Sequence, residues 1–396
     1  MMILRLSNTK KLLAVTFLSN LYFYNHIGTL YQQARGLTLF QVSSITSVII
    51  ITIFLAEVPT GVIADRIGRK WSVVVALLLQ TAGEWGYLFA SSYMAFVMIA
   101  VIAGVGFAFL SGAAEALIYD SLPQENKEDL MKKSWGLIGS AYQLAFFIAP
   151  LAGGMLTSNL SIDSYKRVIL LTAVSVTVAL IISLTFTEPN TQYHHDEKSP
   201  IKIFQAGFKE LIGNKKLKKI LLISTFTMAF PAQLIAFYQP YFSQHKVSTF
   251  WIGAALSLGG LLAAMLQSQV YRFDKMVGKN RSLFLLCVLP GVFLIAFSFL
   301  NSKPLLIIFF ILIYGLSDAK APLLSSYKNK LIDDRSRATV LSLINMISSL
   351  YIALMGLVIG LIANKSLNLV FLFIGIAVIF LTVVLRVQRL PDVVDG

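Results

Sequence analysis

The chain has 396 residues, of which 57% are hydrophobic and only 13% are charged, and its mean hydropathy is +0.75. An ordinary soluble domain has about 25% charged residues, so this composition excludes a soluble globular protein. The net charge of +14 would also suit a protein that binds nucleic acid, unless the cations are arranged for another reason.

Apolar segments follow one another along the whole chain. A membrane span needs roughly 20 apolar residues, and it must be helical because lipid offers no partner for free backbone N–H and C=O groups. The sequence therefore predicts an all-α membrane protein with twelve transmembrane helices. Their expected ranges are 10–33, 41–64, 71–91, 94–119, 134–157, 167–187, 219–243, 249–271, 282–300, 304–327, 338–363 and 367–387.

The cations gather on one side of the expected membrane. With twelve helices the loops alternate sides, and most of the 33 Lys and Arg residues fall in the set that includes both termini. Cytoplasmic loops carry such an excess of Lys and Arg, so we expect both termini in the cytoplasm. This topology explains the positive charge without a nucleic-acid partner. The opposite set of loops holds only Arg35, Lys166, Arg167, Lys246, Lys303 and Lys365.

The chain divides into two expected halves. The long polar stretch 188–218 predicts a cytoplasmic linker between a six-helix bundle at 1–187 and a second at 219–396. Three short motifs recur in the same order, which favours a pseudo-repeat. They are DRIGRK at 65–70 with DKMVGKNR at 274–281, LYQQ at 30–33 with FYQP at 237–240, and GAAE at 112–115 with GLSD at 315–318. Internal repeats of this kind are typical of secondary transporters.

The loop after the second expected helix reads GVIADRIGRK, from 61 to 70. It resembles the loop 2–3 signature of the major facilitator superfamily, and the twelve helices, the six-plus-six repeat and the basic central loop extend the resemblance over the whole chain. The resemblance implies two six-helix bundles around a cavity lined mainly by helices one, four, seven and ten. It also implies a transporter and not an enzyme.

In the superfamily this loop is a latch between the halves. The resemblance implies that Asp65 faces the start of helix eleven near Ala338, and that an arginine of the motif pairs with Asp120 while the cavity is open outward. The alternative is a topological anchor, since cations at the interface hold orientation. Glu57 either joins this network or only accepts a hydrogen bond nearby. The expected gating residues are Glu57, Gly61, Asp65, Arg66, Gly68, Arg69, Lys70 and Asp120.

Helix five reads WGLIGSAYQLAFFIAPLAGG over 135–154. It resembles the glycine-rich pattern of drug–proton antiporters of the superfamily, which ends in Gly-Pro-x-x-Gly-Gly. Ala145 and Ala149 stand where the family has glycine, and a general small-residue packing face is the alternative interpretation. The matching residues are Gly136, Pro150, Gly153 and Gly154.

Ionisable residues inside the expected spans are functional candidates, because a charge at the bilayer centre costs about 2.5–3.5 kcal/mol. Glu115 and Asp318 stand at positions that the sequence echo relates, so we expect both to couple protons, and His26 either titrates with them or packs. Lys320 either pairs with Glu115 or snorkels to the interface. Glu84 lies on helix three, outside the expected cavity wall, and is interpreted as structural.

The expected cavity wall is rich in aromatic and amide side chains. Such a wall suits amphipathic or cationic organic molecules better than sugar phosphates, which would ask for paired arginines. The expected cavity residues are Tyr22, Tyr24, Asn25, Tyr31, Gln32, Tyr142, Gln143, Gln233, Tyr238, Gln239 and Lys320.

These features favour a proton-coupled exporter of small, partly apolar compounds, acting as a monomer in the membrane of a bacterial cell. Its expected partners are protons, a small-molecule substrate and the lipid bilayer, and no cofactor or metal is expected. No phosphate-binding glycine loop occurs in the sequence, which argues against an ATP-driven pump. An uptake symporter for a nutrient and a membrane scaffold or sensor are the alternatives.

Overall fold

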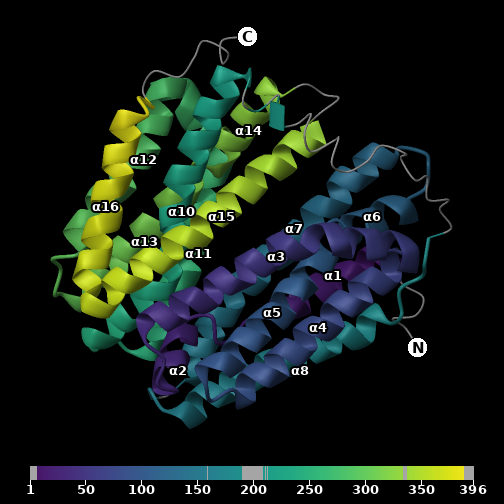
Figure 1. Ribbon diagram of the computed structural model, residues 1–396, viewed down its shortest axis with the longest axis horizontal. Coiled ribbons are helices and arrows are strands. Elements are labelled where there is room, and N and C mark those ends of the chain that lie inside the picture. Colours follow the sequence, from purple (N-terminus) through teal and green to yellow (C-terminus); the bar gives the residue numbers. More distant parts are fainter. Residues whose placement is uncertain are drawn as a thin grey trace. The chain divides into compact units, whose positions relative to one another are not determined.

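The described chain is almost entirely helical. The structure is a computed structural model that describes residues 7–157, 159–189, 208–209, 211, 213–332 and 337–387, leaving aside the side chains of 228–232 and 338. The chain divides into two compact units, one of residues 1–194 with 249–257 and the other of residues 195–248 with 258–396 (Figure 1). Most of the expected linker, 188–218, lies outside the described residues.

The first unit packs its helices around an apolar core of Leu12, Val73, Leu77, Leu117 and Ile118. In Figure 1, α4 lies between α5 and α8, and α3 packs on the other side of α5. The first residues of α11 (Thr249–Val277) also belong to this unit. Its own helices are α1 (Asn8–Ser19), α2 (Gly28–Ala34), α3 (Leu39–Ile67), α4 (Arg69–Phe89), α5 (Tyr93–Leu110), α6 (Ala113–Ser121), α7 (Lys127–Leu156) and α8 (Ile162–Ser183).

The second unit has a separate core that includes Ile223, Leu283, Cys287, Leu324 and Val387. In this unit α12 and α16 lie side by side, and α10 packs against α15 (Figure 1). Besides the rest of α11, its helices are α10 (Lys215–Gln244), α12 (Lys279–Phe297), α13 (Lys303–Ala319), α14 (Ala321–Leu331), α15 (Arg337–Lys365) and α16 (Leu367–Val384).

Two glycines set tight turns at equivalent places. Gly68 joins α3 to α4 with a φ of 93°, and Gly278 joins α11 to α12 with a φ of 88°. Only glycine adopts such angles without steric cost. Each turn lets the next helix start directly after the glycine.

Ten helical segments of the described residues are long and apolar enough to cross a membrane. The first expected span, 10–33, is not among them because it is broken between α1 and α2. Two side chains of α8 satisfy backbone groups that the break frees: Thr172 Oγ1 accepts from the Phe23 N–H at 3.0 Å, and Ser175 Oγ donates to the Leu18 carbonyl at 2.7 Å. Such partners make a broken helix tolerable inside a membrane. The count of twelve spans stays a prediction.

The fourth and tenth expected helices are also interrupted, at Gly112 and at Lys320. Glu115 lies beyond the first break, in α6, whereas Asp318 lies before the second, in α13. The sequence echo that paired Glu115 with Asp318 is therefore wrong in register. The similarity between the four-residue segments 112–115 and 315–318 could not reveal where each helix breaks.

Hydrogen bonds of two tyrosines show the true register of the repeat near the first helix of each unit. The Tyr31 hydroxyl donates to the carbonyls of Tyr87 and Leu88 at 3.3 and 3.1 Å. The Tyr241 hydroxyl donates to the carbonyls of Phe297 and Ser298 at 3.1 and 3.4 Å. All three pairs are 210 positions apart (31 and 241, 87 and 297, 88 and 298). The echo of LYQQ with FYQP, which paired Tyr31 with Tyr238, is therefore out of register by three residues.

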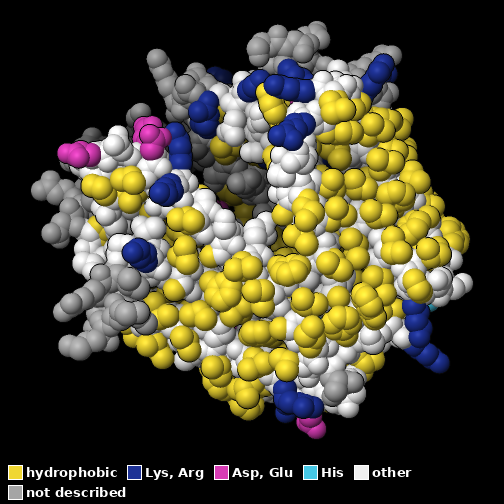
Figure 2. Space-filling view, turned by 180° about the vertical axis from the view of Figure 1, so that it is seen from behind, with side chains coloured by type: hydrophobic (Ala, Val, Ile, Leu, Met, Phe, Trp, Pro, Cys, Tyr) yellow, Lys and Arg dark blue, Asp and Glu magenta, His cyan; other side chains and the backbone are white. Residues whose placement is uncertain are grey.

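Apolar side chains cover much of the surface seen in Figure 2. Large exposed apolar side chains include Phe89, Met94, Met155, Met276 and Phe380. A soluble monomer rarely exposes so much contiguous apolar surface. The surface fits a protein whose sides face lipid.

Candidate functional site

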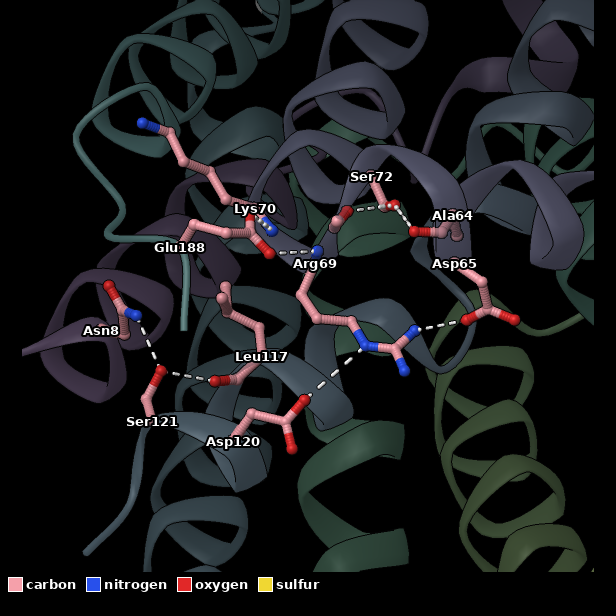
Figure 3. Close-up of polar contacts among 11 residues, drawn as sticks. Asn8, Ala64, Asp65, Arg69, Lys70, Ser72, Leu117, Asp120, Ser121 and Glu188 are labelled. Atoms are coloured by element: carbon pink, nitrogen blue, oxygen red, sulfur yellow. Dashed lines mark hydrogen bonds and ion pairs between the residues drawn. The ribbon is translucent and has the colours of Figure 1, made fainter. Parts of the chain in front are cut away.

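Arg69, the first residue of α4, ties together the turn that carries the GVIADRIGRK motif (Figure 3). Its Nη1 donates to Asp65 Oδ1 at 3.0 Å, and its Nε lies 3.7 Å from Asp120 Oδ2 on α6. The structure therefore brings an arginine of the motif to Asp120, the acid that the resemblance suggested. The contact joins the turn between α3 and α4 to the end of α6.

Glu188 binds the same turn from the other side. Its two carboxylate oxygens accept hydrogen bonds from the backbone N–H groups of Arg69 and Lys70, at 2.7 and 2.9 Å (Figure 3). The first N–H groups of a helix have no partner within the helix, and an anion is favoured at this positive end. Glu188, the first residue of the expected linker, thus caps the N-terminus of α4.

Asn8 holds both acids of this site in place. Its amide donates to Ser121 Oγ at 2.7 Å and to the Thr187 carbonyl at 2.8 Å, and its Oδ1 accepts from the Thr187 N–H at 3.0 Å. Ser121 follows Asp120 and Thr187 precedes Glu188 in the chain. The start of α1 therefore positions both carboxylates around Arg69 (Figure 3).

In the described part of the chain, Glu57, Gly61 and the side chain of Lys70 lie outside this network, although the Lys70 backbone N–H belongs to it. Glu57 is half-buried and forms no hydrogen bond or ion pair with Asp65 in the described part of the chain. Gly61 has open space where a Cβ would stand, and Lys70 lies over the ring of Trp71, with Nζ 5.2 Å from the ring centroid. The side chain of Ala338, the expected second neighbour of Asp65, lies outside the described residues.

The second unit builds a different arrangement at the corresponding turn. Asp274 is buried, and its Oδ1 accepts from Ser282 Oγ at 2.5 Å and from the Tyr327 hydroxyl at 3.3 Å. At the offset of 210 positions, Asp274 and Ser282 correspond to Ala64 and Ser72 of the first unit, and Lys279 corresponds to Arg69. The two turns share a glycine with positive φ, and among the described residues the arginine between two acids belongs to the first.

The glycine pattern of helix five makes very close contacts within the first unit. A Cβ on Gly153 would lie 1.9 Å from the Phe23 carbonyl oxygen, and one on Gly154 would lie 2.9 Å from the Thr249 carbonyl oxygen. At the start of α11, which faces α7 here, a Cβ on Gly253 would lie 2.1 Å from the Pro150 carbonyl oxygen. Small residues allow helices to approach closely, and here three glycines bring α7 against the broken first span and the start of α11.

The earlier part of the pattern behaves differently. Gly136 is exposed, with nothing within 4 Å of a Cβ built on it. Ala145 and Ala149, which replace glycines of the family pattern, are buried against Leu21. The close packing is therefore concentrated at Pro150, Gly153 and Gly154.

The expected proton-coupling residues lie in contrasting surroundings. Glu115 is exposed and forms no ion pair with the described residues of its own unit. Asp318 is half-buried, and Lys320 is fully buried with its Nζ donating to the Ser317 carbonyl at 2.7 Å. Its burial contradicts the alternative that Lys320 snorkels. His26 is fully buried, with its ring against Gly153, which favours the packing interpretation.

Several expected cavity residues are packed inside their units and do not line an open wall. Tyr31 and Tyr238 have no exposed surface, since Tyr31 bonds to backbone carbonyls and Tyr238 stacks on Phe310 with ring centroids 4.2 Å apart. Gln32, Gln233 and Gln239 are also buried. Periodicity could not distinguish a polar side chain that faces a cavity from one that satisfies backbone inside a bundle. Tyr22, Tyr24 and Asn25 are half-buried, and Tyr142 and Gln143 are exposed.

The family follows from a match over most of the chain. Residues 12–356 match the family model described as the Major Facilitator Superfamily. The chain belongs to this superfamily. As a member it is a multi-pass membrane transporter of small molecules and not an enzyme, as the sequence predicted.

Named relatives and solved structures agree with this assignment. The MFS transporter is 24% identical over 383 residues to "Uncharacterized MFS-type transporter YxaM" of Bacillus subtilis (strain 168), covering 94% of this chain and 93% of the relative. It is 25% identical over 237 residues to "Multidrug resistance protein 2" of the same organism, covering 58% and 56% of the two chains. Its fold is similar to that of the nucleoside transporter NupG, with a TM-score of 0.78, 13% identity and coverage of 97% and 99%.

Sequence reasoning missed one carboxylate of this MFS transporter that the structure shows to be engaged. Glu188 is placed by the sequence in the linker, although its position directly after an apolar span was a signal that it could reach a nearby helix terminus. The sequence does not display contacts between distant segments, and such a contact binds Glu188 to the start of α4.

Proposed function

We propose that this MFS transporter exports small amphipathic or cationic organic compounds in exchange for protons, by alternating access. In this proposal it works as a monomer in the bacterial cell membrane, with twelve spans in two six-helix bundles, a cytoplasmic linker and both termini in the cytoplasm. The sequence relation to proteins named for multidrug resistance supports the export direction.

The observation that carries the proposal is the packing of the antiporter-like pattern. Gly153 and Gly154 bring α7 against the Phe23 and Thr249 carbonyls, and Gly253 meets the Pro150 carbonyl from the facing segment. Backbone contact of this kind leaves no room for a water-filled gap between the segments. An exchanger needs such a seal, because a leak at one end of the pathway would dissipate the proton gradient that drives export.

Ionisable groups at the helix breaks support proton coupling. Asp318 and Lys320 lie at the break between α13 and α14, and Glu115 follows the break between α5 and α6. Broken helices commonly carry the ion and substrate sites of secondary transporters. In our proposal Glu115, and secondarily Asp318, binds a proton on one side of the membrane and releases it on the other as access alternates, and a cationic substrate competes with the proton. The half-buried tyrosines Tyr22 and Tyr24 would offer aromatic faces to such a cation.

Transport by the purified protein in proteoliposomes, without ATP, tests the proposal. An imposed pH gradient should drive uphill movement of a lipophilic cation such as ethidium against the proton flow, and a protonophore should abolish it. Empty liposomes are the control. Accumulation of nucleosides or dipeptides together with protons would instead establish an uptake symporter. Movement of no compound under any gradient would favour a scaffold or sensor.

Glu115→Gln and Asp318→Asn test the proposed coupling groups. Each substitution replaces a carboxylate by an uncharged amide of nearly the same shape. We expect Glu115→Gln to abolish gradient-driven transport and to leave substrate binding intact without its pH dependence, and Asp318→Asn to act similarly but more weakly. Equal proton uptake on substrate addition in wild type and Glu115→Gln would eliminate Glu115.

A further inference from the structure

On one face of α4, three buried polar side chains each have one oxygen that forms no hydrogen bond with the described residues. Gln80, Thr81 and Glu84 are 6%, 8% and 9% exposed. Among the described residues, Gln80 Oε1, Thr81 Oγ1 and Glu84 Oε2 make no hydrogen bond. Buried polar atoms are nearly always hydrogen-bonded, so three such atoms within about one helical turn mark a site with a purpose beyond packing.

The Glu84 carboxylate accepts a hydrogen bond from a residue in the break of the first span. Tyr24 lies between α1 and α2, and its hydroxyl donates to Glu84 Oε1 at 3.2 Å. The Tyr24 ring stacks on that of Tyr87, with centroids 5.0 Å apart, and the Tyr87 hydroxyl donates to the Gly28 carbonyl at 3.2 Å. Glu84 is thus linked directly to the irregular segment of the first span, the kind of element that changes shape in transporters.

Among the described residues of its unit, Glu84 forms no ion pair with a cation. The titratable groups that face it are tyrosines: Tyr22 and Tyr24 from the break and Tyr87 from α4, with Tyr142 of α7 behind Tyr22. Helix α5 carries no charged residue, and α8 carries none after Arg167. The other acids of the neighbouring helices form no hydrogen bond or ion pair with Glu84 in the described part of the chain. They are Glu57 and Asp65 of α3, and Glu115 and Asp120 of α6.

The position of Gln80 shows what would complete the site. Residues four apart on a helix are neighbours on its surface, so the side chains of Gln80 and Glu84, each with one acceptor oxygen that lacks a partner among the described residues, stand at neighbouring positions of α4. Two acceptors cannot bond to one another. A proton on Glu84 Oε2 turns it into a donor, and the resulting O–H can bond to Gln80 Oε1. One proton thereby satisfies both atoms and removes an unbalanced buried charge.

We infer that Glu84 is a proton-binding carboxylate of this transporter, with Gln80 accepting from its protonated form and Tyr24 donating to its ionised form. The inference rests on the proposed proton coupling and adds a site to it. The proton binds to the carboxylate and leaves it again as H⁺, and no other bond changes. Loss of the charge weakens the Tyr24 hydrogen bond, which releases the broken segment of the first span to move.

The test is an infrared pH titration of the full-length protein in lipid, which follows the carbonyl band of a protonated carboxyl group. We expect a band that disappears as the pH rises, is absent in Glu84→Gln and persists in Glu125→Gln, an exposed control. Glu84→Asp should retain a titrating band. An identical titration in wild type and Glu84→Gln would overturn the inference.

Substitutions of Tyr24 and Gln80 should shift the midpoint of the Glu84 titration in opposite directions. Tyr24→Phe removes a donor to the ionised form and should move the midpoint to higher pH by about 0.5–1 pH unit, the scale of one hydrogen bond. Gln80→Leu removes an acceptor from the protonated form and should move it to lower pH by a similar amount. Unchanged midpoints, or shifts of the same sign, would overturn the inference even if Glu84→Gln did not fold.

The titration needs no substrate, so it separates this inference from the proposed function. If the wild-type protein does not respond to a pH gradient but the Glu84 band titrates as described, proton-coupled export fails and the proton site stands. If gradient-driven export is observed but the band is unaffected by Glu84→Gln, export stands and the site is wrong.

Discussion

Gly153 of α7 lies so close to the carbonyl oxygen of Phe23 that a Cβ on Gly153 would stand 1.9 Å from it. The same Cβ would stand 2.8 Å from Cε1 of the buried His26. The obstacle is backbone, which cannot turn aside as a flexible side chain can. The contact ties α7 to the segment in which the first span is broken.

Gly153→Ala should therefore destabilise the protein by about 1–3 kcal/mol, the usual cost of overpacking. Gly136→Ala is the matched control on the same helix, where nothing stands within 4 Å of the new methyl group. That control should be neutral or slightly stabilising, because alanine is the better helix former. Thermal unfolding in detergent measures both, and equal stability of the two variants would contradict the close packing.

Glu188→Ala should lower stability by about 1 kcal/mol, the typical value of a side chain that caps a helix. The substitution leaves the N–H groups of Arg69 and Lys70 without the carboxylate that accepts from them at 2.7 and 2.9 Å. Glu125→Ala, at an exposed loop position, is the control. Thermal unfolding and the rate of hydrogen exchange at the start of α4 provide the measurement. Unaltered exchange there would show that Glu188 does not cap the helix.

Asp65→Asn should reduce the transport rate more than the apparent affinity for substrate, with little loss of stability. Its ion pair with Arg69 is partly exposed, and such pairs contribute only about 0–1 kcal/mol. If the motif is a latch, the variant should also shift toward the inward-open form. Spin labels on the ends of α3 and α15 that carry Asp65 and Arg337 measure this shift. An unchanged distance distribution would reduce the motif to a topological anchor.

Tags at residue 1 and residue 396 should both be accessible from the cytoplasm, and a tag at Lys303 only from outside the cell. The physical reason is the preference of Lys- and Arg-rich loops for the cytoplasmic side. Labelling of intact and permeabilised cells distinguishes the two sides. A C-terminus outside the cell would require an odd number of spans and would refute the count of twelve.

The helix-five pattern shows how far a local motif can be interpreted. Pro150, Gly153 and Gly154 can be recognised in the sequence because they stand at the spacing of the family pattern. That Gly153 meets Phe23 and Gly154 meets Thr249, while Gly136 meets nothing, depends on segments distant in the chain. Sequence spacing places small residues on a helix face but does not identify what that face contacts.

The sequence by itself determined the membrane class and the superfamily, because apolar length and a contiguous motif are local properties. Only the tertiary structure decided where the first span breaks, that the repeat relates Tyr31 to Tyr241, and that Glu84 is buried beside Tyr24 and forms no ion pair with the described residues of its unit. Each of these depends on which backbone and side-chain groups meet across the bundle. Hydrogen bonds between distant residues set that register, and hydropathy does not record them.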